Sequence, residues 1–203
     1  MKKYAVLHEP GDIVTLAGTR FVVLDVERRG SLPDSLFLLA LESVGASEFG
    51  SSNNYAESDL KKAVDKWLED MGKRGLDNAK LIPREIDLTT LDGSGCYGKL
   101  SVKAAPLTLD EAREYADIIP NAERWCWLAT GWSGPSKSDG DLALDVSSNG
   151  DWISNYCSNS GGIRPALKIP SDLLLDSADK PDLSEVPTDT LLEEIRRRVV
   201  DKA

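Results

Sequence analysis

The sequence predicts an α+β fold in which two helices flank twisted antiparallel sheets, with a further short helix at the C-terminus. Leu142, Leu144 and Val146 alternate with other residues, which is typical of a half-buried strand. Residues 147–150 read Ser-Ser-Asn-Gly, a turn sequence because Asn and Gly accept positive φ. A returning strand follows from Trp152. Two stretches with helical spacing precede this strand pair, and the combination predicts the α+β class.

The N-terminal part of the chain predicts three strands. Ile13–Leu16 and residues 20–26 are apolar stretches separated by Ala-Gly-Thr, which indicates a hairpin. Residues 36–41 form a continuous apolar run, short enough to be a central strand.

The first helix is predicted from apolar spacing. Apolar residues recur on one helical face across residues 60–71. Ser58 or Asn54 is expected to cap its start, and Gly72 to be the left-handed residue after its end. Trp67 lies on the apolar face, so we expect it to anchor the core.

The second helix is predicted from its start signal. Thr108 and Glu111 have the spacing of a capping box, and Leu107 is placed to pack on Ala112. Pro120 is expected to follow its end.

A final strand is predicted over residues 163–169. Arg164 interrupts its apolar pattern, and we expect this side chain to be partly buried against a carboxylate or carbonyl groups. Pro165 removes a donor from the strand, which predicts an edge or a bulge there. Trp125 and Trp127 precede the strand pair around the Asn-Gly turn and are expected to be largely buried, as is Trp67.

Composition excludes several classes of function. The net charge of −10 over 203 residues argues against nucleic acid as a partner, because phosphate binding needs clustered Lys and Arg. No apolar run approaches the ~18 residues of a membrane span, which predicts no membrane insertion. The N-terminus lacks the pattern of a signal peptide. We therefore expect a cytoplasmic or virion-associated protein, in which the three cysteines are reduced thiols.

The sequence contains no recognisable catalytic or metal-binding motif. His8 is the only histidine and lies far from any Ser or Cys motif, which argues against a catalytic triad. The cysteines lack the paired spacing of zinc ligands. We therefore expect a protein that is not an enzyme and that uses no cofactor and no metal.

Several short motifs carry a resemblance to a known fold. The order W-x-W-L (residues 125–128), a strand pair around an Asn-Gly turn, a small polar loop and G-I-R-P-A-L (residues 162–167) resembles the C-terminal half of C-type-lectin-like domains from phages and bacteria. It is similar in particular to a family of uncharacterised function in that fold. The sequence N-N-Y-A-E-S-D-L-K-K-A-V-D-K-W-L (residues 53–68) also matches. The resemblance spans residues 10–170 and implies a C-type-lectin-like fold.

Distant relatives of this fold suggest two different functions. Formylglycine-generating enzymes would imply an oxidase with Cys126 or Cys157 reactive, although the local sequences do not match. Retroelement-diversified receptor-binding proteins would imply recognition through the corresponding loops. Calcium-dependent lectins use E-P-N or Q-P-D and W-N-D tripeptides, and none of these occurs. The acidic loop residues around Asp145 are therefore expected to be solvated rather than to bind calcium.

The candidate binding surface is the loop-rich region of residues 132–160. Aromatic residues mixed with Ser, Asn and Asp are typical of adaptable recognition surfaces. We expect a non-enzymatic binding module, encoded by a phage or mobile element, that recognises a protein or cell-surface ligand. The side chains expected to make the contacts are Trp132, Ser133, Lys137, Asn149, Asp151, Asn155, Tyr156 and Asn159.

The C-terminal region differs in composition from the domain of residues 1–170. Residues 171–187 are acidic and contain proline, which predicts a linker. Residues 188–203 predict a helix with Leu192, Ile195 and Val199 in one stripe. The stripe would either dock on its own domain or form a homo-oligomer, as in a virion or assembly component; the sequence leaves both open.

Overall fold

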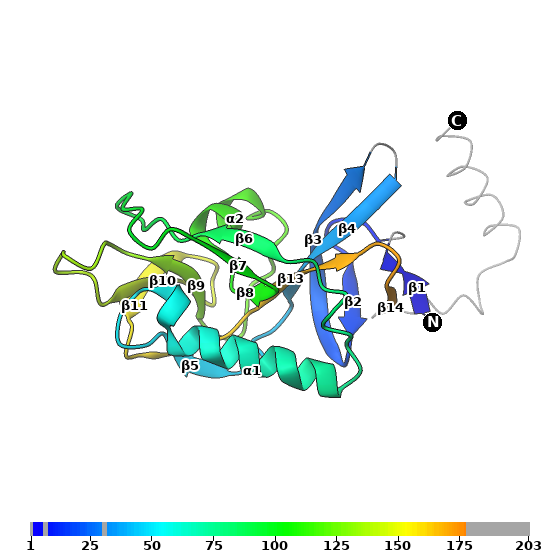
Figure 1. Cartoon of the computed structure of the whole chain (residues 1–203), viewed down its shortest axis with the longest axis horizontal. Helices are drawn as coiled ribbons and strands as arrows, with labels where there is room; N and C mark the ends of the chain where they lie inside the picture. Colours follow the sequence, from blue (N-terminus) through cyan, green and yellow to red (C-terminus); the bar gives the residue numbers. More distant parts are fainter. Residues whose placement is uncertain (1, 6–7, 30–31, 178–203) are drawn as a thin grey trace, which may run out of the picture.

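The computed structural model describes residues 2–5, 8–29 and 32–177, and within them the chain has an α+β fold with mostly antiparallel sheets (Figure 1). The largest sheet has the strand order β1 (Lys2–Tyr4), β14 (Leu174–Ser177), β2 (Ile13–Leu16), β3 (Thr19–Arg29), β4 (Leu32–Ala40), β13 (Ala166–Pro170), β8 (Ala104–Ala105). The second sheet has the order β11 (Trp152–Tyr156), β10 (Leu142–Val146), β9 (Cys126–Gly131), β12 (Ser160–Gly162), β5 (Ala46–Glu48). A small third sheet pairs β6 (Arg84–Asp87) with β7 (Lys99–Val102).

The large sheet is covered on both faces. Phe21 and Val23 of β3 enter one hydrophobic cluster together with α1 (Asp59–Lys73), whereas Val22 and Leu24 enter a second cluster together with α2 (Leu109–Glu114). This alternation follows from the period of two in a strand. A bulge after Val23 shifts the register. Figure 1 shows the two helices on opposite sides of the molecule, so the prediction of two flanking helices is confirmed.

Helix α1 begins where the sequence predicts and ends later. Ser58 is the N-cap, with its side chain accepting from the amide of Lys61, while Asn54 caps the preceding 3-10 turn (Tyr55–Glu57). The expected end at Gly72 is wrong, because the helix continues to Lys73 and the left-handed residue is Gly75, with a φ of 102°. A Cβ at Gly72 would lie 3.1 Å from the Asn78 side chain, so this glycine serves a close contact instead.

Helix α2 has the predicted capping box between Thr108 and Glu111. The helix is shorter than expected, since regular bonding stops at Glu114 and turns continue only to Ile118. Glu111 also forms an ion pair with Arg84, a buried residue of β6 that donates to two backbone carbonyls. The ion pair therefore connects the start of α2 to the third sheet.

The predicted strand over residues 163–169 is wrong at its beginning. Residues 163–165 are irregular and connect β12 in one sheet to β13 in the other. β13 lies between β4 and β8 rather than at an edge. Arg164, inside the connection, is 6% exposed and donates to the carbonyls of Ala40 and Pro120, so the prediction of burial against carbonyl groups is confirmed.

The expected linker is partly structured. Leu174–Ser177 forms β14, which pairs with β1 on one side and β2 on the other. This pairing gives hydrogen-bond partners to the backbone N–H and C=O groups of all three strands. The predicted C-terminal helix, with Leu192, Ile195 and Val199, lies outside the described residues.

The three predicted core tryptophans differ in burial. Trp67 is 9% exposed and packs at 6.3 Å from the ring of Phe21, and Trp127 is 1% exposed. Trp125 is only half-buried, with its ring edge-on to Trp127 at a centroid distance of 4.8 Å. Burial is therefore confirmed for two of the three.

Candidate functional site

The predicted binding region is built on the antiparallel unit β9–β10–β11. Residue pairing places Val146 opposite Trp152, Leu144 opposite Ser154 and Leu142 opposite Tyr156, so these side chains share one face of the sheet. β11 is the edge strand in the described sheet. A sheet edge presents backbone donors and acceptors that another chain can pair with.

Strand β11 carries a concentration of exposed apolar surface. Four large hydrophobic side chains are exposed among the described residues, and three of them belong to β11: Trp152 at 43%, Ile153 at 42% and Tyr156 at 59%. The fourth is Leu91, at 39%, on the loop between β6 and β7. Trp152 is contacted by the guanidinium group of Arg113, 5.6 Å from the ring centroid. Trp152 and Tyr156 lie on one face of this edge strand and Ile153 on the other, and we call the three together the β11 patch.

Three of the predicted ligand contacts lie in the loop between β9 and β10. Trp132 is half-buried and packs on the hydrophobic cluster of α2. Ser133 is buried, at 2% exposure, which removes it from the surface. Lys137 is exposed and its ammonium group forms an ion pair with the carboxylate of Asp92.

Two more predicted contacts, Asn149 and Asp151, are exposed in the turn between β10 and β11. Their amides donate to Oγ of Ser147, at 3.2 and 3.1 Å. This hydroxyl group organises the turn and leaves both side chains at the surface, at the Trp152 end of β11.

The remaining predicted contacts lie at the other end of β11. Tyr156 is exposed, and Asn159 donates through Nδ2 to Oδ1 of Asn155 at 3.2 Å. Asn155 in turn donates to Asp145, which has no exposed surface. Burial raises the pKa of Asp145 to about 6, against the lowering effect of the Asn155 bond. The eight predicted residues therefore occupy three places and do not form one cluster.

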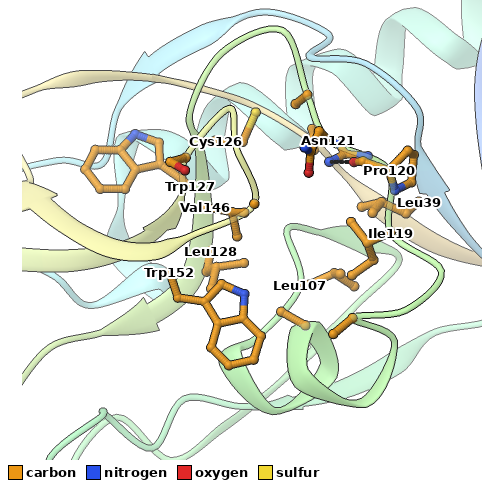
Figure 2. A pocket seen from close by; sticks show the side chains of 16 residues that line it. Leu39, Leu107, Ile119, Pro120, Asn121, Cys126, Trp127, Leu128, Val146 and Trp152 are labelled. Carbon is orange, nitrogen blue, oxygen red and sulfur yellow. Dashed lines mark hydrogen bonds between the residues drawn. The ribbon is translucent and has the colours of Figure 1, made fainter.

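A cavity that the sequence did not reveal lies behind the β11 patch (Figure 2). It has a volume of about 140 Å³ and lies between α2 with its following turns and the sheet of β9–β11. Its walls are mostly apolar and its polar groups few, as in small-molecule sites. The wall residues include Leu39, Leu107, Ile119, Leu128, Val146 and Trp152.

One end of the cavity is polar. Arg164 lines it, with Nε donating to the Ala40 carbonyl at 3.0 Å and Nη1 donating to the Pro120 carbonyl at 3.1 Å. Its Nη2 atom is buried and has no hydrogen-bond partner among the described residues. Desolvation lowers the pKa of Arg164. Asn121 lines the same cavity, and Figure 2 shows it beside Pro120.

Cys126 lies in β9 and Cys157 in the turn that follows β11, in different surroundings. Cys126 lines the cavity, whereas Cys157 belongs to the hydrophobic cluster of α1. Burial raises the pKa of Cys126 to about 11 and that of Cys157 to about 12. Both groups are therefore protonated thiols at neutral pH, and the thiolate is the reactive form. Cys96 is exposed.

Neither His8 nor any group of potential metal ligands adds a site in the described part of the chain. His8 is buried, with Nδ1 at 3.3 Å from Oδ2 of Asp12. The described residues contain no group of His, Cys, Asp or Glu side chains suited to a metal ion. In the same part of the chain, no helix has the length and apolarity needed to cross a membrane.

Comparison of the chain with protein-family models, with curated proteins and with solved structures finds no match. A function for this chain is therefore inferred from its own geometry.

Proposed function

We propose that this chain is a non-enzymatic binding protein that recognises a protein partner through the β11 patch, within the predicted region of residues 132–160. The observation that carries the proposal is the concentration of exposed Trp152, Ile153 and Tyr156 on one edge strand. Exposed apolar groups on a sheet edge favour association, and Trp and Tyr are frequent hot-spot residues of interfaces.

The surroundings of the patch support a rigid recognition surface. Backbone pairing with β10 holds β11 along its length. The Arg113 guanidinium holds the Trp152 ring from one side. Polar side chains flank both ends, with Asn149 and Asp151 at one and Asn159 at the other. An apolar centre with a polar rim is the usual organisation of an interface.

We also propose a C-type-lectin-like fold and a phage or mobile-element origin, because the sequence motifs resemble those of such domains. What supports the fold is that α1, the β9–β10–β11 unit and the segment before β13 follow one another in the order of those motifs. The oxidase alternative receives no support, because Cys126 lines the cavity whereas Cys157 is buried in the hydrophobic cluster of α1. Assembly through the C-terminal helix concerns residues outside the described part of the chain.

Site-specific photo-crosslinking tests the proposal. A photoreactive phenylalanine analogue replaces Ile153 or Tyr156 in cells that produce the protein, and Leu91 in a control of matched exposure. The proposal predicts that one and the same partner protein is crosslinked from positions 153 and 156 and not from position 91. Crosslinking from position 91 alone, or from none of the three positions, would contradict it.

A further inference from the structure

We infer that the cavity behind the β11 patch binds a small carboxylate whose apolar body has about the size of one aromatic ring. This site concerns a different class of ligand from the proposed protein-binding surface and shares only Trp152 with the β11 patch. The carboxylate would pair with Arg164, and the apolar body would fill the space between α2 and β9–β11.

The charged end of the cavity lacks an anion. Arg164 is 6% exposed, and no ion pair among the described residues includes it. Two of its donors are satisfied by carbonyls, and Nη2 is left without a partner. Buried charges are normally paired, because burial without a partner is costly. A ligand carboxylate at the end of the cavity that Arg164 lines would supply the missing negative charge.

The cavity has the size of a single ring. Its volume of about 140 Å³ is close to the ~150 Å³ of an engineered apolar cavity that holds benzene. Figure 2 shows Trp152 across the cavity from Asn121 and Pro120, with Leu107, Leu128 and Val146 between them. The ligand would therefore lie with its apolar body against these walls.

The same features argue against other anions. A phosphate or sulfate group favours several donors and a polar surround, whereas this cavity has one cation and mostly apolar walls. Asn121 adds one neutral polar group at the Arg164 end. A Cβ at Gly150 would lie 2.9 Å from Oδ1 of Asn121, so the glycine lets Asn121 lie close to the turn.

Isothermal titration with three probes tests the inference: benzoate, its neutral counterpart benzyl alcohol, and acetate, which lacks the ring. We expect benzoate to bind saturably with a Kd of about 1 mM or tighter, as a ligand of its size allows. Benzyl alcohol and acetate should each bind at least ~10-fold more weakly, since each lacks one of the two interactions. Equal binding of benzoate and benzyl alcohol, or no saturable benzoate binding, would overturn the inference.

Two variants locate the benzoate site. Arg164→Met keeps an unbranched apolar stem but removes the guanidinium group, and it should abolish the preference for benzoate over benzyl alcohol. Ala116→Phe should abolish benzoate binding, because Ala116 lines the cavity from an exposed turn and the larger ring would fill it. If Arg164→Met fails to fold, Ala116→Phe decides the matter. Unchanged benzoate affinity in Ala116→Phe would contradict the assignment.

The surface variant Ile153→Ser/Tyr156→Ser separates this inference from the proposed function. Neither residue lines the cavity, so the double variant should bind benzoate as the wild type does. A parallel loss of benzoate binding in this variant would contradict a separate site.

Discussion

Nδ2 of Asn155 lies 2.9 Å from Oδ2 of Asp145, so a residue predicted to contact a ligand holds a buried carboxyl group instead. Asp145 has no exposed surface, and its Oδ1 has no partner among the described residues. This relationship links the edge strand β11 to the stability of the sheet behind it, and it has consequences that measurements can detect.

The first prediction concerns pH. Because burial raises the pKa of Asp145 to about 6 from an ordinary value of 3.8, the folded state binds more protons than the unfolded state between these values. The free energy of unfolding should therefore fall as pH rises from about 4 to about 6, by at most ~3 kcal/mol at ~1.4 kcal/mol per unit.

The variant Asp145→Asn should remove this contribution and be more stable than the wild type at pH 7. Urea denaturation at several pH values measures both effects. If the free energy of unfolding depends on pH in the same way in the wild type and in Asp145→Asn, the Asp145 carboxyl group does not have the raised pKa described here.

The second prediction concerns Asn155. Asn155→Ala should lower the free energy of unfolding at pH 7 by about 1–3 kcal/mol, because it leaves the Asp145 carboxylate with no donor. In the background of Asp145→Asn the same substitution should cost less, since a neutral amide is easier to bury. Denaturation of the two single variants and the double variant measures this coupling. Additive losses would argue against the contact.

A third prediction concerns the core. Trp67→Ala should cost about 3–5 kcal/mol, as other truncations of large buried aromatic side chains do. Tyr156→Ala is the control, since this side chain is 59% exposed and surface substitutions usually cost within ~0.5 kcal/mol. Chemical denaturation compares the two, and a loss under ~1 kcal/mol in Trp67→Ala would refute the placement.

The fourth prediction concerns the thiols. In the folded protein at neutral pH, one cysteine should react rapidly with a disulfide reagent, and Cys96→Ser should abolish that rapid phase. Cys126 and Cys157 should react only after unfolding, because burial raises both pKa values to about 11 and about 12. Rapid reaction of either buried cysteine would revive the oxidase alternative.

Local signals in the sequence predicted the helices well. The apolar face of α1 and its cap at Ser58 depend on residues within a few turns of each other, and so does the capping box of Thr108 and Glu111. The strand pair β10–β11 is also predictable, because its signals, alternating apolar residues and an Asn-Gly turn, lie within a short stretch of sequence.

Features that depend on distant contacts were not predictable in this way. β14 pairs with β1 and β2, and its short apolar run, residues 173–175, lies in a segment whose acidic, proline-containing composition predicts a linker. The cavity combines Leu39, α2 and β9–β11, which are far apart in the chain. Trp132 is predicted to contact a ligand as part of the loop-rich region of residues 132–160, yet it is half-buried and packs on the α2 cluster.

The most direct test of the central claim is the affinity of the crosslinked partner for purified variants. Ile153→Ser/Tyr156→Ser should weaken binding at least ~10-fold, since hot-spot residues each contribute more than ~1 kcal/mol and ~1.4 kcal/mol is tenfold. Leu91→Ser, with matched exposure, should bind as the wild type does. If the double variant binds with wild-type affinity, the β11 patch is not the recognition surface.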